Sequence, residues 1–423
     1  MEVIISPVPI EGRVSANASK SAMQRAIAAA LMAKGKSIIY NPGKSNDCLA
    51  ALDVARNLGA EVNYVNDKIE IIGRGVEPVS SEINCGESGL GIRMFTPIAA
   101  ISEKQLTIHA EGSLKSRPVS FFEEVLPQLD VQCHTQNGNP PISLRGPLQA
   151  RDITVDGSLS SQFLTGLLMA YGSRAENNTI TVTDLKSKPY IDLTLQIMQH
   201  FGVKVINEDF KKFHFGSRQH FRACDYTVEG DWSGAAFLLV AGAVAGQTEV
   251  DNLNIRSAQS DKAILQALEK AGAKVMKGMF TILIEKGPLN AFEFDATDCP
   301  DLFPPLVSLA ANCNGTTILK GAGRLAHKES DRAKTLKEEF GKLGIRIDLK
   351  NDEMLIYGGT GIHAAETSSH YDHRIAMACA VAALNADAPV KITYAEAVNK
   401  SYPEFWNHWQ KIGGKVQVIA AKS

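Results

Sequence analysis

The sequence predicts an α/β fold made of six copies of one structural unit, and two observations lead to this prediction. The first is a helix-ending signature that returns at intervals of about 70 residues, at positions 59, 130, 202, 272, 344 and 413. The second is its surroundings: an apolar-periodic helix comes before each signature, and two short β-rich runs come after it. Few enzymes are built from six such repeats, so the period narrows the function as well as the fold.

Each element of the repeat has a local cause in the sequence. The helix ends where a Gly can take the left-handed conformation, as in Leu58-Gly59-Ala60. Only the second copy departs from this, with Asp130 at the Gly position. The β-rich runs are clear in the fourth copy, at residues 273–276 and 280–284, and their composition is typical of strands.

The division into lobes must use short crossovers, because no low-complexity stretch or long Pro/Ser linker separates the repeats. Three repeats per lobe is the simplest split, and its midpoint falls at the polar, Gly-containing turn of residues 228–234. A matching crossover is expected near residues 15–19, since the opening strand precedes the first repeat and needs a sheet edge to join. A single fused body without motion stays open as an alternative.

Composition excludes several classes of function. The 423-residue chain is 44% hydrophobic, which is ample for sizeable cores, and its net charge is −2. With no long basic run, this balance argues against nucleic-acid or anionic-membrane partners. The seven cysteines are scattered singly, which fits reduced thiols in a cytosol and gives no zinc site. Because no signal peptide or membrane span is evident, we expect a soluble, cytoplasmic protein.

Polar strings in the first half lie where helices are expected to begin. Ser19-Lys20-Ser21, followed by Arg25, opens the first long helix, whose N-terminus offers N–H groups and the positive dipole end to an anion. The Gly-rich turn at residues 85–93 allows a ligand close to the backbone, but it matches neither a P-loop nor a dinucleotide fingerprint. Residues 115–117 and Ser160-Ser161-Gln162 also precede helices. Taken alone, each string is more often an ordinary cap or a solvated corner.

The second half supplies three similar strings, at residues 328–332, 371–374 and 399–403. Arg, Lys and carboxylate side chains alternate in them, and a charged helix start such as the first is usually a surface ion-pair patch. His373 alone would be a structural histidine. The recurrence of these strings near helix starts in both halves changes the interpretation, because facing lobes could aim them into one cleft. Such a convergence of cations and helix N-termini predicts a polyanion site, most simply for a phosphorylated small molecule.

With these strings, the sequence closely resembles the 5-enolpyruvylshikimate-3-phosphate synthase family of enolpyruvyl transferases over essentially its whole length. The most specific strings are residues 157–163, Ser187-Lys188-Pro189-Tyr190-Ile191-Asp192, Lys328-Glu329-Ser330-Asp331-Arg332, Tyr371-Asp372-His373-Arg374 and Asn399-Lys400-Ser401-Tyr402-Pro403. The resemblance implies two lobes, each of three βαβαββ units around a pseudo-threefold axis. It also implies that residues 1–18 and 230–423 form one lobe, that 19–229 form the other, and that the active site lies between them.

The resemblance further implies transfer of the enolpyruvyl group of phosphoenolpyruvate to the 5-hydroxyl of shikimate 3-phosphate, with release of phosphate, in the shikimate pathway. No metal or organic cofactor is expected, and we expect a monomer. Asp301 matches the acceptor of the 5-hydroxyl proton and Glu329 the proton donor to the methylene carbon, and Lys20 completes the catalytic set. The positions that match shikimate 3-phosphate contacts are Lys20, Ser21, Arg25, Ser160, Ser161, Gln162, Ser187, Tyr190, Asp301 and Lys328. The positions that match phosphoenolpyruvate contacts are Lys20, Gly89, Arg117, Gln162, Arg332, His373, Arg374 and Lys400.

The chain departs from the family pattern at a few positions. Asn17-Ala18 stand where members usually carry Pro-Gly, which leaves the geometry of the first crossover open. In the Gly-rich turn, Glu87, Leu90 and Met94 replace the usual Asn, Thr and Pro. Because the family inhibitor glyphosate sits against this turn, we expect this chain to bind it more weakly than sensitive members do. Arg324 or a neighbour stands where many members have Asn, and its contact is not assigned.

Two rival functions are weighed against this resemblance. The sister enzyme transfers enolpyruvyl to UDP-N-acetylglucosamine, but its reactive Cys position, five residues before the match to Arg117, is Gly112 here. A non-catalytic phosphometabolite-binding protein would be the alternative from another class, since a repeat scaffold can keep an anion pocket without turnover. The presence of both Asp301 and Glu329 argues against it.

Overall fold

Six four-stranded sheets form the framework of the chain, one for each repeat in the sequence. In the computed structural model, which describes residues 1–419, every sheet has the same plan. Two strands run parallel at one side, and two further strands continue the sheet in antiparallel pairing. The α/β fold of six repeats is therefore confirmed.

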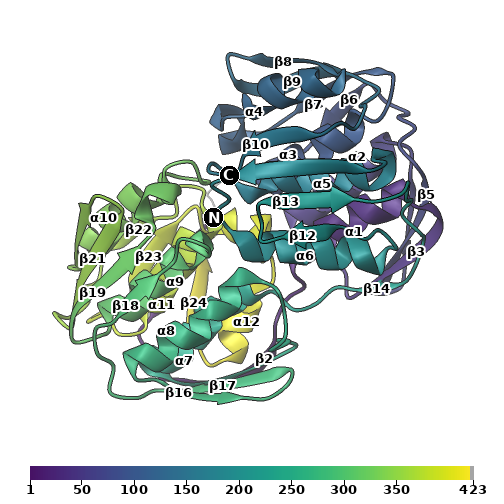
Figure 1. Ribbon diagram of the computed structural model, residues 1–423. Coiled ribbons are helices and arrows are strands. Elements are labelled where there is room, and N and C mark those ends of the chain that lie inside the picture. The colour runs from purple at the N-terminus through teal and green to yellow at the C-terminus, as the bar shows by residue number, and fades with distance from the viewer. Residues whose placement is uncertain (420–423) are drawn as a thin grey trace. The chain divides into compact units, whose positions relative to one another are not determined.

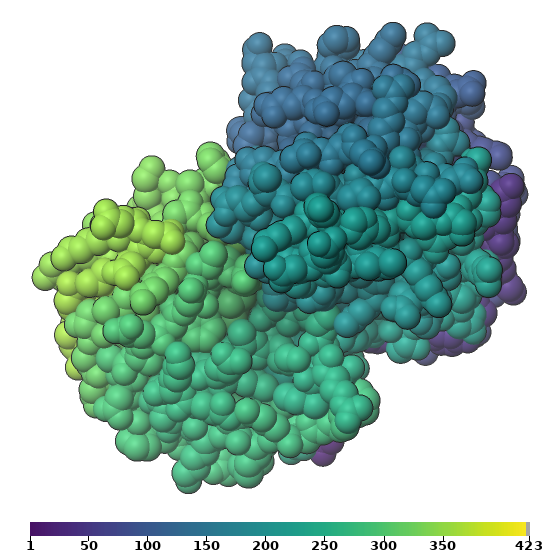
Figure 2. Space-filling model, in the orientation of Figure 1, coloured from purple at the N-terminus to yellow at the C-terminus, as the bar shows by residue number. Residues whose placement is uncertain are grey.

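The chain folds into two compact units. Unit 2 is Ala18–Val228, and unit 1 is Met1–Asn17 together with the chain from Glu229 onward. Figure 2 shows one face of the molecule in space-filling form, with the later part of unit 1 in green to yellow.

Unit 2 holds the first three repeats. Its elements are α1 (Lys20–Met32), β3 (Lys34–Tyr40), α2 (Asn46–Asn57), β4 (Glu61–Val65), β5 (Lys68–Arg74), β6 (Glu82–Asn84), α3 (Gly89–Ala99), β7 (Gln105–His109), α4 (Phe121–Val125), β8 (Gln132–Gln136), β9 (Asn139–Arg145), β10 (Ile153–Asp156), α5 (Ser161–Arg174), β11 (Asn178–Thr183), α6 (Lys188–His200), β12 (Ile206–Glu208), β13 (Lys212–Phe215) and β14 (Tyr226–Thr227).

Unit 1 holds the last three repeats and the two opening strands. Its elements are β1 (Glu2–Ser6), β2 (Ile10–Ser15), α7 (Trp232–Ala245), β15 (Gly246–Asp251), α8 (Ile264–Ala271), β16 (Lys274–Lys277), β17 (Thr281–Glu285), β18 (Glu293–Asp295), α9 (Phe303–Ala311), β19 (Gly315–Lys320), α10 (Arg332–Lys342), β20 (Arg346–Lys350), β21 (Glu353–Gly358), β22 (Glu366–Ser368), α11 (His373–Ala383), β23 (Val390–Thr393), α12 (Phe405–Lys411) and β24 (Lys415–Ile419).

The two crossovers exchange strands between repeats. Strand β2, which precedes the first repeat, pairs in parallel with β15 of the fourth, and β14, which precedes the fourth repeat, pairs in parallel with β3 of the first. At the first crossover, the carbonyl of Asn17 accepts a hydrogen bond from the N–H of Asp231 at 2.8 Å. The two crossover segments are thus joined through Asn17.

In each unit three central helices form the core, with the sheets around them (Figure 1). Helices α1, α3 and α5 pack on one another in unit 2, as do α7, α9 and α11 in unit 1. Every residue of α3, α7, α9 and α11 is buried. Such helices are apolar over most of their surface because neighbours cover all sides, and their many Ala and Gly residues allow close packing.

The exceptional Asp130 behaves like the glycines that it replaces. It ends the second repeat's helical segment with φ 61°, in the left-handed region, where Asp is better tolerated than most residues. The helix before it is shorter than the sequence period predicts. It consists of α4 and a 3₁₀ turn at Leu126–Leu129, whose Pro127 removes a backbone donor.

Candidate active site

The N-termini of the three central helices of unit 2 meet at one end of that unit. Ser88, the N-cap of α3, donates from Oγ to Gln24 Oε1 of α1 at 2.8 Å. Arg93 of α3 donates from Nη1 to Gln162 Oε1 of α5, also at 2.8 Å. Each helix start leaves backbone N–H groups without intrahelical acceptors and carries the positive end of its dipole. This end of unit 2 is therefore suited to anions.

Lys20 and Arg25 both project from the first turns of α1. Lys20 Nζ lies 2.7 Å from Asp47 Oδ2 of α2, and the Asp47 side chain is only 4% exposed. Arg25 is buried and donates from Nε to Thr194 Oγ1 and from Nη1 to the carbonyl of Ser21, both at 2.8 Å. Burial lowers its pKa to about 10, so the guanidinium remains charged at neutral pH.

Arg25 has only neutral hydrogen-bond acceptors among the described residues, which include Thr165 Oγ1 and the Tyr190 carbonyl, both at 3.5 Å. Its guanidinium carbon also lies 5.9 Å from the centre of the Tyr190 ring. A buried cation without a carboxylate partner is costly unless an anionic ligand compensates it. The arrangement is therefore suited to a ligand carboxylate or phosphate.

The start of α3 is in contact with Arg117. A Cβ added at Gly89, the first residue of the helix, would lie 2.8–3.0 Å from the Arg117 guanidinium, so Gly is what lets this group approach the backbone. The Glu87 carboxylate packs closely against Gly112 in the same way. A Cβ added at Gly112 would lie 2.4 Å from the Glu87 carboxylate carbon. The Arg117 cation and the helix N-terminus thus form one positive site.

The remaining predicted residues of unit 2 lie at the starts of α5 and α6. Ser160 is the N-cap of α5, and its Oγ accepts from the Gln162 N–H at 3.2 Å. Ser161, the first residue of the helix, is buried. Ser187 takes the cap position of α6 with a left-handed φ of 56°, and the N–H of Tyr190 donates to its carbonyl at 3.1 Å. These side chains come from two neighbouring helix starts of the third repeat.

Arg332, the first residue of α10, is the centre of the charged cluster in unit 1. Its side chain is 0% exposed, and each of its nitrogens contacts a carboxylate. Nη1 lies 2.7 Å from Asp301 Oδ1, Nη2 lies 2.5 Å from Glu329 Oε2, and Nε lies 2.7 Å from Asp372 Oδ2. The two carboxyl groups expected to be the base and the acid are thus held by one guanidinium.

Asp301 also contacts Lys328 Nζ at 3.1 Å and Arg374 Nη2 at 3.4 Å. Burial disfavours its charged form, but Arg374, Lys328 and Arg332 outweigh burial and hold the pKa of the Asp301 carboxyl well below its usual value. Burial in turn lowers the pKa of Lys328. Asp301 is therefore ionised at neutral pH, as a proton acceptor must be.

Arg374 lies in the first turn of α11, with its side chain 4% exposed. Its Nε and Nη1 have no hydrogen-bond acceptor in the described part of the chain. Guanidinium donors that are buried and lack an acceptor are expected to bind an anionic ligand. His373, beside it, is fully buried, and Lys400 ends the 3₁₀ turn Ala395–Lys400 with 6% exposure. Arg324 donates from Nη1 to the Thr297 carbonyl at 2.7 Å.

Three carboxylates at these sites did not emerge from the sequence. Asp47 binds Lys20, and Asp372 caps α11 while holding Arg332. Asp261 is fully buried; Ser233 donates to its Oδ2, and Ser260 donates to its Oδ1 at 3.2 Å. Burial first, and then the neighbouring charge of Asp301, raises the pKa of Asp261 to about 6. The residues that lead up to Asp261, 259–261, form no motif that would have predicted its place in the site.

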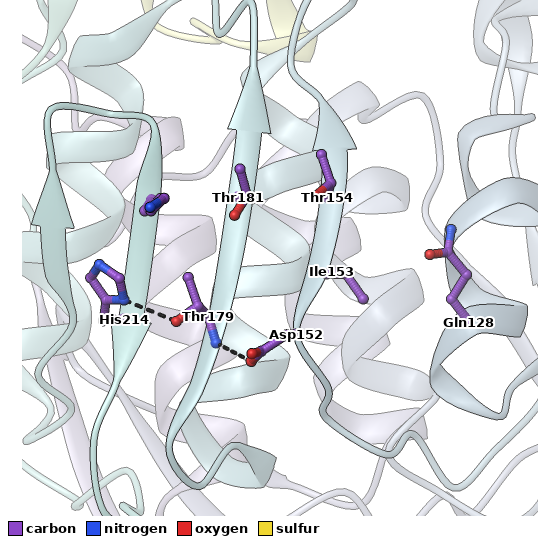
Figure 3. Close-up of a pocket in the computed structure, with 8 residues that line it drawn as sticks. Gln128, Asp152, Ile153, Thr154, Thr179, Thr181 and His214 are labelled. Atoms are coloured by element: carbon purple, nitrogen blue, oxygen red, sulfur yellow. Dashed lines mark hydrogen bonds between the residues drawn. The ribbon is translucent and has the colours of Figure 1, made fainter.

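Two further places in the described chain have features of ligand sites. Glu338, Glu339 and His370 bring possible metal-ligating atoms within 4.8 Å, but the Glu339 carboxylate already accepts from Lys342 Nζ at 2.8 and 3.0 Å. A pocket on sheet β10-β11-β13-β12 is lined by Gln128, Asp152, Ile153, Thr154, Thr179, Thr181, Lys212 and His214 (Figure 3). Asp152 and His214 are both hydrogen-bonded to Thr179. No predicted site residue lines this pocket.

Comparisons with known proteins agree with these motifs. The model of the EPSP synthase (3-phosphoshikimate 1-carboxyvinyltransferase) family matches residues 4–409. The 3-phosphoshikimate 1-carboxyvinyltransferase of Clostridium perfringens is 35% identical over 417 residues, which cover 98% of each chain. The enzyme of the same name from Aeropyrum pernix is 36% identical over 418 residues, covering 99% of this chain and 97% of its own.

Solved structures show the same fold. EPSP synthase from Acinetobacter baumannii matches with a TM-score of 0.82 and 25% identity, covering 99% of this chain and 100% of that one. The enolpyruvyl transferase NikO from Streptomyces tendae matches with a TM-score of 0.79 and 16% identity over 98% of each chain, which shows the fold alone. The family predicted from the sequence strings is confirmed: this chain belongs to the EPSP synthase (3-phosphoshikimate 1-carboxyvinyltransferase) family.

Proposed function

We propose that this chain transfers the enolpyruvyl group of phosphoenolpyruvate to the 5-hydroxyl of shikimate 3-phosphate, giving 5-enolpyruvylshikimate 3-phosphate and phosphate. The reaction belongs to the shikimate pathway and so to aromatic amino acid biosynthesis. Family membership over residues 4–409 supports it. The observation that carries the proposal is the cluster in which buried Arg332 holds Asp301 and Glu329 at 2.7 and 2.5 Å. An acid and a base within reach of one cation are what an addition–elimination needs.

The proposed chemistry runs in two stages. In the addition, Asp301 accepts the 5-hydroxyl proton as the oxygen attacks C2 of phosphoenolpyruvate, while Glu329 donates a proton to the methylene carbon C3. In the elimination, the Glu329 carboxylate takes back a proton from the new methyl group, and phosphate departs with the proton that Asp301 had accepted. The carbon–carbon double bond is thereby restored and both carboxyl groups return to their starting states. Both carboxyl groups are thus used in opposite protonation states during one turnover.

Substrate binding would adjust both groups. In the unliganded cluster, three cations contact Asp301, which makes it a weak base, and Arg332 holds the Glu329 carboxylate. When the substrates' own anions share the charges of Arg332, Arg374 and Lys328, Asp301 becomes more basic and Glu329 can take up a proton. Exclusion of water would favour the protonated acid further.

The substrates also explain why cations come from both units. Two anions with about two and three charges, roughly 7 Å apart at an effective dielectric near 20, would repel by on the order of 14 kcal/mol. We propose that both units close on them. Arg117, Arg332, Arg374 and Lys400, with Lys20, would hold phosphoenolpyruvate. Lys20, Ser21, Arg25, Lys328 and the α5 and α6 starts would hold shikimate 3-phosphate, with Tyr190 beneath its ring.

The test is incubation of the purified chain with both substrates, with detection of the product and of released phosphate. Omission of either substrate should abolish both signals. Phosphate release with UDP-N-acetylglucosamine in place of shikimate 3-phosphate would instead favour the sister enzyme. Binding of shikimate 3-phosphate with no turnover under any condition would favour a non-catalytic binding protein.

We also infer that the chain acts as a cytoplasmic monomer. All the residues proposed to bind the substrates belong to one chain, and its seven cysteines are thiols rather than disulfides, as in reducing compartments. Among the described residues, no helix reaches the length and apolarity that a bilayer crossing requires. Light scattering coupled to size-exclusion chromatography should give the mass of one chain, 45.6 kDa.

A further inference from the structure

Two tyrosines next to the charged cluster of unit 1 have an unusual backbone conformation. Tyr371 has φ 58° and Tyr394 has φ 55°, both in the left-handed region. The rings are exposed, by 59% and 42% respectively. A bulky residue in this region is strained, and strain of this kind persists only where the surroundings enforce it.

The other repeats show what this position normally carries. Tyr394 directly follows β23, the second strand of the parallel pair in its sheet. At the same point in four other repeats, the left-handed residue is Asn41, Asp184, Asn252 or Gly321. Asn, Asp and Gly are the residue types that tolerate this conformation. The sixth repeat therefore keeps a tyrosine where the same fold elsewhere uses a residue without strain.

The rings of the two strained tyrosines pack against each other in a tilted arrangement, which is called the Tyr371–Tyr394 stack below. Their ring centres are 4.3 Å apart with an interplanar angle of 37°. Ser369 joins the same two turns, because its Oγ donates to the Tyr394 carbonyl at 2.9 Å and accepts from the Tyr371 N–H at 3.1 Å. Since Tyr371 is mostly exposed and Tyr394 is only about half-buried, burial of apolar surface accounts for only part of this pairing.

The turn that carries Tyr371 is also anchored on its other side. His370, with φ 50°, places Nε2 2.7 Å from Oε1 of Glu339, whose side chain is 0% exposed. The N–H of Ser368 donates to Glu339 Oε2 at 2.8 Å. Two consecutive left-handed residues are thus clamped between a buried carboxylate and the Tyr394 ring.

This turn leads directly into the cluster that holds the proposed acid and base. The N–H of Asp372 donates to the Ser369 carbonyl at 2.9 Å. The Asp372 carboxylate then accepts from Arg332 Nε at 2.7 Å, from Ser330 Oγ at 3.1 Å and from the Arg374 N–H at 3.0 Å. Any shift of the turn would move Asp372, and with it the guanidinium that contacts Asp301 and Glu329.

We propose that the Tyr371–Tyr394 stack is a positioning device for the reaction. The stack holds the left-handed turn so that Asp372 keeps Arg332 directed at Asp301 and Glu329. The two tyrosines are positioning residues and touch no substrate in this proposal. This inference rests on the proposed function, because Arg332 is assigned to phosphoenolpyruvate there.

Substitution by Asn separates the two roles that the tyrosines could have. Tyr371→Asn and Tyr394→Asn relieve the backbone strain but remove the stack, whereas Tyr371→Phe and Tyr394→Phe keep both rings. We expect the Asn variants to keep or raise the melting temperature, while kcat/KM for phosphoenolpyruvate falls about tenfold to a hundredfold. The KM for shikimate 3-phosphate should change less, and the Phe variants should stay near wild type. The double Asn variant should lose no more kcat/KM than the less active of the two single variants, because the rings act as a pair.

Several results would overturn the inference. Asn variants within twofold of wild-type kcat/KM would show that the tyrosines are ordinary surface residues. Equal losses in the Phe variants would assign the effect to the hydroxyl groups, and a lowered melting temperature in the Asn variants would make the stack a stability element. A crystal structure of Tyr371→Asn gives an answer independent of activity: we expect a displaced Asp372 carboxylate, and an unchanged 2.7 Å contact with Arg332 contradicts the inference. An inactive wild type in the same assay would refute the proposed function instead.

Discussion

Arg332 shows how one residue sets the geometry of the charged cluster in unit 1. Its three nitrogens each contact a different carboxylate, those of Asp301, Glu329 and Asp372. A Lys could not reproduce this, because an ammonium is a point charge on a flexible stem and lacks the planar fork of a guanidinium. Since the side chain is fully buried, the carboxylates also compensate the cost of removing its charge from water.

The roles of the two carboxyl groups can be tested by isosteric amides. We expect Asp301→Asn and Glu329→Gln each to lower kcat by about 10²- to 10⁴-fold, because each removes a proton-transfer group. The Kd for shikimate 3-phosphate, measured by calorimetry, should change only modestly. Glu103→Gln, at an exposed position, serves as the control and should leave both values unchanged. Near-wild-type turnover in either variant would mean that the role is assigned to the wrong residue.

Asp261 should leave a signature in the pH dependence of stability. Its carboxyl has a pKa of about 6 when folded, above the ordinary value of 3.8, so the folded state binds the proton more tightly than the unfolded state. Its contribution to stability is therefore fully present below pH 4 and is lost as the pH rises through 6. Asn cannot titrate, so we expect Asp261→Asn to gain stability relative to wild type by about 1 kcal/mol more at pH 8 than at pH 5.

Urea unfolding of both proteins at the two pH values measures this difference. Asp209→Asn, at a side chain that is 78% exposed, is the matched control and should show no such difference. If the stability gap between Asp261→Asn and wild type is the same at both pH values, the carboxyl does not titrate in this range. The comparison reports Asp261 together with the charges that interact with it, those of Asp301 and Arg374.

The sequence predicted the cations of the proposed site but few of the carboxylates that contact them. Asp372 lies inside a recognised string, and its place as the N-cap of α11 could have been found from capping preferences. Asp47 and Asp261 could not, because their contacts with Lys20 and Ser233 join residues 27 and 28 positions apart. Such contacts depend on how helices pack, which local patterns do not encode.

At the scale of elements, helix N-termini carry most of the candidate site residues in both units. The central helices begin with Lys20, Gly89 and Ser161 in unit 2, and with Arg374 in the first turn of α11 in unit 1. The side chain that caps α3 also connects this helix to a neighbour, because Ser88 donates to Gln24 of α1. The position of one helix start therefore depends on its neighbours.

This dependence predicts a difference between two similar N-caps. Ser88 Oγ accepts from the Gly91 N–H at 2.9 Å and also donates to Gln24, whereas Ser45 Oγ accepts from the Cys48 N–H at 3.3 Å at the start of α2. We expect Ser45→Ala to cost about 1 kcal/mol, the usual value of a cap. Ser88→Ala should cost roughly 1–3 kcal/mol more, since it leaves the buried Gln24 oxygen without a donor.

Chemical denaturation of the two variants measures both costs on one scale. Both serines are almost fully buried, at 1% and 3% exposure, so differences in solvation do not confound the comparison. Equal losses in the two variants would show that the link from Ser88 to Gln24 contributes nothing to stability. A larger loss for Ser45→Ala would contradict the argument outright.

The repeat made the elements predictable, but not how the repeats share strands. The six helix ends and the β-rich runs after them could be placed from local periodicity. The exchange of β2 and β14 between the first and fourth repeats could only be anticipated in part, from the need of the opening strand for a partner. Sheet order joins segments more than 200 residues apart, so it is set by tertiary packing.

For the whole molecule, the cations of the proposed site are distributed over the two units. Lys20, Arg25 and Arg117 belong to unit 2, while Arg332 and Arg374 belong to unit 1. Arg25 lacks a carboxylate partner, and Arg374 keeps donors without acceptors, within the part of the chain that is described. In the proposed reaction, the substrates' anionic groups supply what both units lack.

Shikimate 3-phosphate should therefore draw the two units together, because its phosphate and carboxylate attract cations of both. We expect the radius of gyration from small-angle scattering to fall when the ligand is added at saturation, with binding verified by calorimetry on the same sample. Inorganic phosphate at equal concentration is the control, since it lacks the ring and carboxylate that would connect the α5 and α6 starts with Lys328. The salt dependence adds a second criterion: the change should weaken as ionic strength rises, because exposed charges are screened over about 8–10 Å near physiological salt. Unchanged scattering with the ligand fully bound would mean that the units do not move, and the single fused body would then be the correct description.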